Sequence, residues 1–360
     1  MKILMVLHKY GIPLSDPCCF PLGYMTISSV LKQSGHDVTI NNQNIHDPLP
    51  MEGYDAVLFT GFEDFLPQIK RDADICKAKG IKTILGGALA TFKPEEMLEY
   101  VDTVVVGEGE IVVEQALHTA GIIQGISPDL KTVPRPDYEG FGAAEYHKRN
   151  GMKHVGVLAS RGCPFSCNFC AHTCKFQYRD VDSVMEEIDS HGDVDMVVFN
   201  DNTFNFNKQR FMGIAGRMTK PWSAAIRVDV FDEEMAIAAK DGGCAYFVVG
   251  VESFKQEKLD QMNKKITVKQ IYSCLDLLHK YDIKYHGNIL TGLPGESTED
   301  IFAEVLSIPA KYNVFPVLVQ PFVGTKYQTR DISKDDAHNF SELYAGIVKS
   351  RNMHMYPTND

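Results

Sequence analysis

The strongest constraint on the fold is an alternation of short apolar segments with amphipathic segments of helical period, which begins at Lys2 and continues through most of the 360 residues. Apolar runs of about five residues that are rich in Val, Ile and Leu are typical of strands buried on both faces. Helices between such strands allow consecutive strands to run parallel, because each crossover covers one face of the sheet. The sequence therefore predicts an α/β protein built on parallel sheets.

The first part of the chain contains five predicted strands with helices between them. The strands are expected at Lys2–His8, Asp37–Asn41, Ala56–Gly61, Lys82–Leu85 and Thr103–Gly107, and the helices at Leu22–Gln33, Asp64–Lys79 and Glu110–Ala120. An open, doubly wound sheet is the simplest arrangement of these elements. We therefore expect a Rossmann-like domain over residues 1–125.

The alternation stops between Gly121 and Gly151, where Pro128, Pro134 and Pro136 interrupt the pattern. Proline and glycine at this density, with little periodic apolar pattern, are typical of a connecting segment. The sequence predicts an ordered linker over residues 126–150.

The alternation then resumes with six predicted strands. They are expected at His154–Ala159, Asp195–Asn200, Ser223–Val228, Ala245–Val251, Tyr285–Leu290 and Val314–Gln320, with helices such as Val181–Asp189, Glu233–Lys240, Val268–Lys280 and Glu299–Leu306 between them. Six βα repeats are enough to curl into a partial barrel. We expect a partial (βα)6 barrel over residues 151–325 and a short C-terminal extension over residues 326–360.

Charge and cysteine usage narrow the class of partner and the compartment. The 36 basic and 47 acidic residues give a net charge of −11, and the basic residues are dispersed, which argues against duplex nucleic acid and anionic membranes as partners. The chain has no apolar run of 18 residues, and its apolar start lacks a signal-peptide cleavage site. Three of the nine cysteines lie within eight residues, which suits a metal site in a reducing compartment, so a cytoplasmic protein is expected.

These three cysteines carry the clearest chemical signal. Cys163, Cys167 and Cys170 form C-x3-C-x2-C in SRGCPFSCNFC, directly after the first strand of the predicted barrel. Three thiolates can hold three irons of a 4Fe-4S cluster and leave the fourth iron open to a ligand. The alternatives are a structural zinc site completed by Cys174 or His172, and ordinary buried cysteines; zinc sites usually bring two separated C-x2-C pairs, and this sequence has no second pair.

The cysteine motif and three later motifs resemble the radical S-adenosylmethionine (SAM) superfamily. The later motifs are FNDNTF at Phe199–Phe204, VVGVES at Val248–Ser253 and LTGLPGEST at Leu290–Thr298, and they follow the order of a radical SAM barrel. The resemblance covers about residues 151–325. It implies that SAM chelates the open iron and that the reduced cluster cleaves SAM to a 5′-deoxyadenosyl radical.

Under this resemblance, residues at the ends of successive strands would hold SAM. Asn200 and Asp201 would accept hydrogen bonds from the methionyl ammonium, and Arg227 would bind a carboxylate. Glu252 and Ser253 would bind the ribose or the methionine moiety, and Gly292 and Gly295 would let the backbone approach adenine.

Each of these assignments has a purely structural alternative. Asp201 and Asn202 could cap the next helix, Arg227 and Glu252 could pair with each other, and Gly292 to Gly295 could form only a turn.

The first domain and the linker resemble the cobalamin-binding domain that precedes many radical SAM barrels. The resemblance rests on PLGYMTISSVLKQSGHDVTI, ILGGALATFKPEEMLEYVDTVVVGEGE and VPRPDYEGF, over about residues 1–142. Loops after the third, fourth and fifth strands would meet the cofactor, and the expected contacts are Gly61, Phe62, Gly86, Gly87, Gly107 and Glu108. The D-x-H-x-x-G motif that gives a histidine to cobalt elsewhere is replaced by HKYG at the first strand, so a domain that kept the fold and lost the ligand is the alternative.

Together these resemblances imply a cobalamin-dependent radical SAM enzyme that acts as a methyltransferase on an unactivated carbon, with a 4Fe-4S cluster, SAM and cobalamin as cofactors. The expected partners are a small-molecule or peptide substrate and an external electron donor of the flavodoxin or ferredoxin type. The alternatives are a radical SAM oxidoreductase or cyclase without methyl transfer, and a non-catalytic module that senses redox state through cobalamin and the cluster.

Overall fold

A computed structural model of the chain describes residues 1–9, 20–151, 153–171, 174–293, 295–318 and 325–327. They form two compact units, Met1–Gly162 with Thr173–Asp195, and Cys163–His172 with Met196–Asp360. The predicted domain boundaries at residues 125, 150 and 325 stay predictions. Apart from Lys326 and Tyr327, the predicted C-terminal extension lies outside the described residues.

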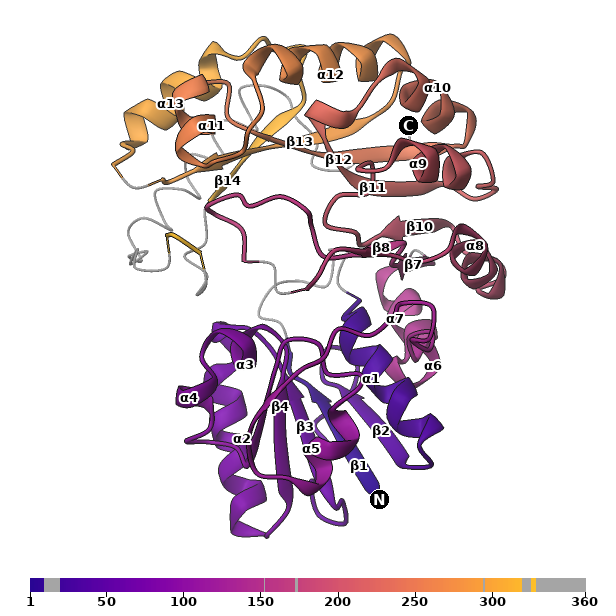
Figure 1. Ribbon diagram of the computed structural model, residues 1–360, viewed down its shortest axis with the longest axis vertical. Coiled ribbons are helices and arrows are strands. Elements are labelled where there is room, and N and C mark those ends of the chain that lie inside the picture. Colours follow the sequence, from indigo (N-terminus) through magenta and orange to yellow (C-terminus); the bar gives the residue numbers. More distant parts are fainter. Residues whose placement is uncertain (10–19, 152, 172–173, 294, 319–324, 328–360) are drawn as a thin grey trace. The chain divides into compact units, whose positions relative to one another are not determined.

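The first unit contains a parallel sheet of six strands in the order β2-β1-β3-β4-β5-β6 (Figure 1). The strands are β1 (Lys2–Leu7), β2 (Asp37–Asn42), β3 (Ala56–Thr60), β4 (Lys82–Gly86), β5 (Thr103–Val106) and β6 (Gly121–Gln124). Because β2 lies on one side of β1 and β3 on the other, the strand order reverses between β1 and β3, and ligands of open parallel sheets bind beyond the carboxyl ends of strands near such a point. The predicted Rossmann-like sheet is confirmed.

Helices cover both faces of this sheet. They are α1 (Leu22–Gln33), η1 (Glu63–Phe65), α2 (Leu66–Ala78), α3 (Ala88–Phe92), α4 (Pro94–Met97) and α5 (Val113–His118). Leu4 and Val6 of β1 pack with residues of α2, α3 and α4, whereas Ile3 and Met5 pack with residues of α1 and α5. Since successive side chains of a strand point to opposite faces, a run of consecutive apolar residues is what a strand covered on both faces requires.

Strand β6 was not predicted, because Gly121–Gln124 is only four residues long and begins on Gly121, which has φ of 101°. It pairs with β5 from Thr103 to Val106. The rest of the predicted linker contains two short helices, α6 (Tyr138–Phe141) and α7 (Ala143–Asn150). Asp137 caps α6, since its Oδ1 accepts a hydrogen bond from the Gly140 N–H at 2.9 Å.

The first unit also contains β7 (His154–Val157), the ribbon of β8 (Ser160–Arg161) and β9 (Gln177–Tyr178), and α8 (Val181–Ser190). Strands β8 and β9 are antiparallel and bracket the cysteine loop in the sequence. The first predicted strand of the barrel, His154–Ala159, is therefore shorter than expected, and its last residues precede β8.

The second unit is built on parallel strands in the order β14-β13-β12-β11-β10. The strands are β10 (Met196–Phe199), β11 (Trp222–Arg227), β12 (Cys244–Glu252), β13 (Tyr285–Thr291) and β14 (Val314–Leu318). The helical elements between them are α9 (Lys208–Ala215), η2 (Val228–Val230), α10 (Glu233–Asp241), α11 (Gln256–Gln261), α12 (Val268–Lys280) and α13 (Thr298–Ser307). The predicted βα alternation is confirmed in this unit.

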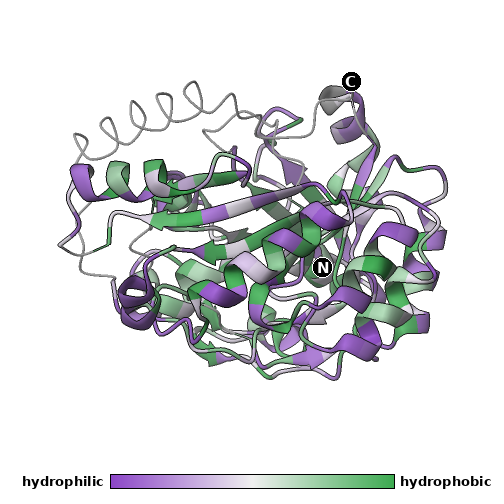
Figure 2. Cartoon of the chain, turned by 90° about the horizontal axis from the view of Figure 1, so that it is seen from above, coloured by the Kyte–Doolittle hydropathy of each residue, from purple (hydrophilic) through white to green (hydrophobic). Residues whose placement is uncertain are grey.

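Buried aromatic rings stabilise the second unit. Trp222 is fully buried and contacts the rings of Phe199, Phe211 and Phe247. In Figure 2 the helices carry both hydrophobic and hydrophilic residues, as expected of helices that cover a sheet with one face.

Among the described helices, none combines the length and the apolar character that a bilayer span needs.

Candidate functional site

The cysteine loop begins after Gly162, which has φ of 75°. A Cβ on Gly162 would lie 2.5 Å from the backbone oxygen of Cys174, so a side chain does not fit at this position. Glycine is therefore required, both for its backbone conformation and for space, immediately before Cys163.

The three predicted ligands are partly exposed and lie outside disulfide bonds. The Sγ of Cys163 lies 3.5 Å from the Oγ1 of Thr203, and the Cys170 N–H donates to the Cys167 carbonyl at 3.2 Å. In the described part of the chain, no three His, Cys, Asp or Glu side chains are grouped as ligands of a single metal ion, and His172 lies outside that part. A single zinc ion gathers its thiolates on one atom, whereas a 4Fe-4S cluster places each thiolate on a separate iron, to which these three partly exposed thiols can each contribute one.

Two buried cations lie near Cys167. The Nη1 of Arg227 is 3.8 Å from the Cys167 Sγ, and both Arg227 and Lys264 are about nine-tenths buried or more. Burial raises the pKa of the Cys167 thiol, and the positive charges of Lys264 and Arg227 oppose that rise. The two cations thus favour the thiolate form of Cys167, which is the form that binds a metal.

Arg227 ends β11 and is held from several sides. Its Nε and Nη2 donate to the two carboxylate oxygens of Asp229 at 2.9 and 3.2 Å, and Nη2 also donates to the Lys264 carbonyl at 2.9 Å. The guanidinium carbon lies 3.6 Å from the centre of the Phe165 ring. An Arg227–Glu252 pair is therefore wrong, because the fork of Arg227 is used by Asp229.

Glu252 ends β12 and pairs with Lys264 instead. The Lys264 Nζ lies 2.6 Å from Glu252 Oε1, and both side chains are less than a tenth exposed. Glu252 has φ of 65°, in the left-handed region, where a residue with a side chain is strained. The register of β12 against β13 also shifts between Gly250 and Glu252, so the strand end departs from regular geometry where the charged pair forms.

The other predicted SAM residues follow the same edge of the sheet. Asn200 and Asp201 come directly after β10, and Asp201 is buried. The next helix, α9, is capped by Asn207, so the alternative that Asp201 or Asn202 caps it is wrong. Ser253 is fully buried, and its hydroxyl donates to Glu304 Oε1, which gives it a structural partner within the chain.

Gly292 follows β13 and has φ of 75°. Its N–H donates to Glu296 Oε2 at 2.7 Å, and the Leu293 N–H donates to the same oxygen at 3.1 Å. Gly292 therefore begins a turn closed by Glu296, as the turn alternative expects. Gly295 has φ of 83°, and a Cβ there would meet no atom within 4 Å.

The predicted cobalamin contacts follow the carboxyl ends of three neighbouring strands. Gly61 follows β3, Gly86 ends β4 and Gly107 follows β5. A Cβ on Gly86 or Gly107 would meet no atom of the described residues within 4 Å, so these residues leave space for a ligand at both positions. This open edge fits a large planar cofactor that lies over the strand ends.

The remaining contacts divide between packing and exposure. A Cβ on Gly61 would lie 2.7 Å from the Phe65 ring, and one on Gly87 would lie 2.6 Å from the Thr60 Oγ1. These two glycines are thus required by the fold itself. Phe62 is 46% exposed.

Glu108 has partners within the chain. Its Oε1 lies 2.9 Å from the Nη1 of Arg161, and its other oxygen accepts a hydrogen bond from the Ser127 hydroxyl. Arg161 Nη1 also lies 2.6 Å from Glu110 Oε1, and all three charged side chains are nearly buried. Arg161 immediately precedes Gly162, so this buried ion cluster ties the loop after β5 to the residue from which the cysteine loop starts.

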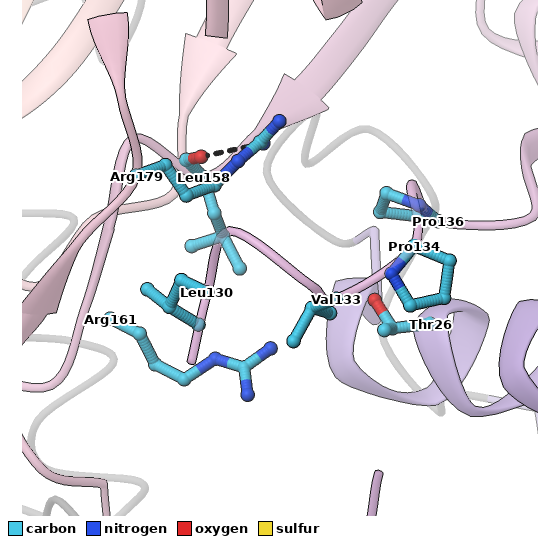
Figure 3. A pocket seen from close by; sticks show the side chains of 8 residues that line it. All are labelled: Thr26, Leu130, Val133, Pro134, Pro136, Leu158, Arg161 and Arg179. Atoms are coloured by element: carbon cyan, nitrogen blue, oxygen red, sulfur yellow. Dashed lines mark hydrogen bonds between the residues drawn. The ribbon is translucent and has the colours of Figure 1, made fainter. Parts of the chain in front are cut away.

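Arg161 also lines a small pocket with Arg179 and with residues of the predicted linker, among them Pro134 and Pro136 (Figure 3). Arg179 donates to the Leu158 carbonyl at 2.9 Å, which is the bond drawn in Figure 3. The pocket has a volume of about 30 Å³, which accommodates only water, whereas sites for small organic ligands usually have several hundred Å³.

Sequence reasoning missed two buried cations, Lys264 and Arg161. Lys264 lies in QMNKKIT, which matches no motif considered, and its burial depends on a loop conformation that periodicity does not report. Arg161 stands in SRGC, two residues before the first cysteine, and a basic residue so close to a predicted metal ligand is a feature of the sequence that could have indicated its role.

Two family models match separate parts of the chain. The family model of the Radical SAM superfamily matches residues 157–305, and that of the B12 binding domain matches residues 15–117. The two matches fall on the strand ends described above, in the predicted order.

Three of the proteins that are similar over most of the chain are methyltransferases by name. An uncharacterized methyltransferase of Pyrococcus horikoshii is 28% identical, over 91% of this chain and 82% of its own length. The bacteriochlorophyllide d C-12(1)-methyltransferase of Chlorobaculum tepidum is 27% identical, over 87% of this chain and 74% of its own. The solved structure of the radical SAM methyltransferase TsrM from Kitasatospora setae, with cobalamin and a [4Fe-4S] cluster bound, shares the fold with a TM-score of 0.70 at 17% identity, over 91% of this chain and 76% of that one.

Proposed function

Because the chain belongs to the family of radical SAM enzymes that carry a cobalamin-binding domain, we propose that it transfers a methyl group to an unactivated carbon. The predicted enzyme class and cofactors, a 4Fe-4S cluster, SAM and cobalamin, are confirmed by the two family models. The observation that carries methyl transfer is the pairing of both domains in one chain that is similar over nearly its whole length to two methyltransferases.

The cluster would be held by Cys163, Cys167 and Cys170. Their loop fits the group because it offers three partly exposed thiols outside disulfide bonds, and the nearby Arg227 and Lys264 favour the thiolate form of Cys167. When bound, the cluster and SAM supply a 5′-deoxyadenosyl radical, and cobalamin carries the methyl group. The protein's own task is to orient these groups and keep water away.

SAM would lie along the strand ends of the second unit, with its carboxylate held by a cation. Arg227 was predicted for that role, but Asp229 and the Lys264 carbonyl already use its Nε and Nη2. The Lys264 ammonium lies 2.6 Å from Glu252 Oε1 and has three N–H donors, so it can donate to a second carboxylate, which makes it the better candidate. Asn200, Asp201, Glu252, Ser253 and Gly292 remain our candidates for the other parts of SAM.

Cobalamin would lie over the carboxyl ends of β3, β4 and β5. Gly86 and Gly107 leave the backbone open there, and Phe62 offers an exposed ring. His8, which stands in the HKYG that replaces the cobalt-ligating motif, is buried, and its Nε2 lies 3.0 Å from Asp72 Oδ2. We therefore do not assign His8 as a ligand of cobalt.

The substrate is a small molecule or a peptide, and the electron comes from an external donor of the flavodoxin or ferredoxin type. These two partners, the cytoplasmic location and the domain limits at residues 125, 150 and 325 are part of the proposal. The cysteine usage of the sequence supports the cytoplasmic location, and the interruption of the strand–helix alternation between Gly121 and Gly151 supports the division into domains.

The test is an anaerobic assay of the protein reconstituted with iron, sulfide and cobalamin, given SAM and dithionite. We expect 5′-deoxyadenosine and S-adenosylhomocysteine, together with corrin absorbance that stays with the protein through gel filtration. 5′-Deoxyadenosine without S-adenosylhomocysteine, measured with substrate present, would favour a radical oxidoreductase or cyclase. No cleavage of SAM by a fully loaded protein would point to the sensing module and overturn the proposal.

A further inference from the structure

The loop that carries the three cysteines is hydrogen-bonded to the segment that follows α11. This segment runs from Gln261, the last residue of α11, to Lys265 and is here called the loop anchor. The Asn168 N–H donates to the Met262 carbonyl at 2.9 Å, and the Asn168 Nδ2 donates to the Gln261 carbonyl at 2.7 Å. From the other side, the Asn263 Nδ2 donates to the Ser166 carbonyl at 2.7 Å.

These bonds fall on both neighbours of Cys167 in the sequence. Ser166 precedes Cys167 and Asn168 follows it, so the backbone on each side of this ligand is fixed to the loop anchor. Fixing a residue in one backbone conformation has an entropic cost, and a loop that is fixed in advance avoids that cost when it receives its ligand.

The local conformation of the loop anchor explains why it can present Asn263 in this way. Asn263 has φ of 52° and ends α11: its N–H donates to the Asp260 carbonyl, and the Lys264 N–H donates to the Leu259 carbonyl, both at 3.0 Å. This pair of bonds is the Schellman arrangement, in which glycine is the usual residue and asparagine is tolerated. Glycine would suffice for the helix end, but only asparagine also provides an amide that reaches Ser166.

We propose that Asn263 is a positioning residue that holds the cysteine loop, and Cys167 in particular, in the conformation that receives the cluster. The inference rests on the proposed function, because it assumes that the three cysteines bind a 4Fe-4S cluster. Asn263 touches neither cluster nor SAM in this scheme; it acts through Ser166 and the backbone of Cys167.

A matched pair of variants separates this role from helix capping. Asn263→Gly keeps the left-handed conformation and removes the amide. Asp282→Gly makes the corresponding change at the end of α12, where Asp282 has φ of 49°, the Ile283 N–H donates to the Leu278 carbonyl, and the side chain is 96% exposed. Asn168→Ala removes the Asn168 Nδ2 bond to Gln261 from the cysteine loop itself.

The experiment measures how fast the reconstituted protein loses iron to an excess of EDTA without oxygen, followed by the absorbance of the cluster. One lost hydrogen bond corresponds to roughly a 2- to 10-fold change, so we expect Asn263→Gly and Asn168→Ala to lose iron about that much faster than wild type and Asp282→Gly to match wild type. Equal rates for wild type and Asn263→Gly, or the same acceleration in Asp282→Gly, would overturn the inference and leave the proposed function standing. A wild-type protein that takes up no cluster would instead overturn the proposed function.

Hydrogen exchange of the cluster-free protein gives a second measurement that needs no iron. The Asn168 amide is expected to be protected in wild type and in Asp282→Gly, and to exchange faster in Asn263→Gly. Asn263→Asp, which keeps the size of the side chain and loses the donor, should behave as Asn263→Gly does. An Asn168 amide that exchanges equally fast in all four proteins would show that the loop is not held in advance.

Discussion

The guanidinium Nη1 of Arg161 lies 2.6 Å from Glu110 Oε1, and the two residues are 51 positions apart in the sequence. Arg161 directly precedes Gly162, and Glu110 belongs to the GEGE sequence after β5, so this ion pair joins two distant segments of the first unit through side chains. The predictions that follow test this pair, the proposed ligands and the buried charges around them.

Replacing Arg161 should destabilise the protein strongly. Arg161→Ala leaves Glu108 and Glu110 buried without their cation, and breaking a buried ion pair from one side costs about 3–5 kcal/mol. For a chain of this size we expect the midpoint of thermal unfolding to fall by on the order of 10 °C. Arg135→Ala, which removes a pair in which Arg135 is 45% and Glu186 71% exposed, is the control and should change it by roughly 2 °C or less. Similar shifts for the two variants would refute a stabilising role of the Arg161 cluster.

Cys167→Ala should abolish cluster binding. The variant keeps two of three thiolates, which leaves one iron of the cluster without its protein ligand. We expect iron per chain after anaerobic reconstitution to fall close to zero, measured by colorimetric iron determination. Cys174→Ala is the matched control and should load as wild type does; loss of iron in that variant would favour a site completed by Cys174.

Lys264→Gln should weaken SAM binding. A hydrogen bond from a charged donor contributes about 1.5–3 kcal/mol, so the dissociation constant of SAM for the reconstituted protein should rise about 10- to 100-fold, measured by equilibrium dialysis. Lys264→Arg should recover part of the affinity. Lys311→Gln, which removes an exposed pair with Asp276, should leave the constant unchanged. If Lys264→Gln binds SAM as wild type does, Arg227 becomes the stronger candidate for the carboxylate.

Thiol labelling should separate the cysteine loop from the core. Burial raises the pKa of the Cys76 thiol to about 12, and its side chain is fully buried, so at pH 8 only about one molecule in ten thousand carries the thiolate there. Iodoacetamide added to the cluster-free, folded protein should modify the partly exposed Cys163, Cys167 and Cys170 well before Cys76, as read by peptide mass spectrometry. Early modification of Cys76 would contradict the buried position of its side chain on α2.

Acid should remove a stabilising contribution of Asp137. Burial by itself would raise the pKa of this carboxyl, but hydrogen bonds from Lys32, Ser28 and the Gly140 N–H hold the pKa below its ordinary value of 3.8. The folded state therefore binds this proton more weakly than the unfolded chain, so the contribution is present above pH 3.8 and is lost as the pH falls through the lowered value.

The variant Asp137→Asn isolates this effect. Its unfolding midpoint should lie below that of wild type at neutral pH, and the difference should shrink as the pH is lowered from about 5 to about 3. A difference that stays constant over this range would mean that the carboxylate charge does not matter.

The sequence by itself determined the order of the elements and supplied the proposed cluster ligands. Consecutive apolar residues such as Ile3 to Val6 reveal strands covered on both faces, because burial acts on every side chain of such a strand. The three cysteines are close in the sequence, so their spacing alone indicates a shared site. Strand β6 escaped prediction because four residues beginning with glycine carry too little pattern.

Only the tertiary structure decided which charges meet. Arg227 pairs with Asp229 and Glu252 with Lys264, although both Arg227 and Glu252 end neighbouring strands and the sequence permitted them to pair with each other. Arg161 reaches Glu108 and Glu110 across more than 50 residues, and Asn263 reaches Ser166 across 97. Hydrophobic periodicity reports which face of an element is buried, whereas a hydrogen bond depends on the positions of individual atoms, which are set by loop conformations such as the left-handed residues Glu252 and Asn263.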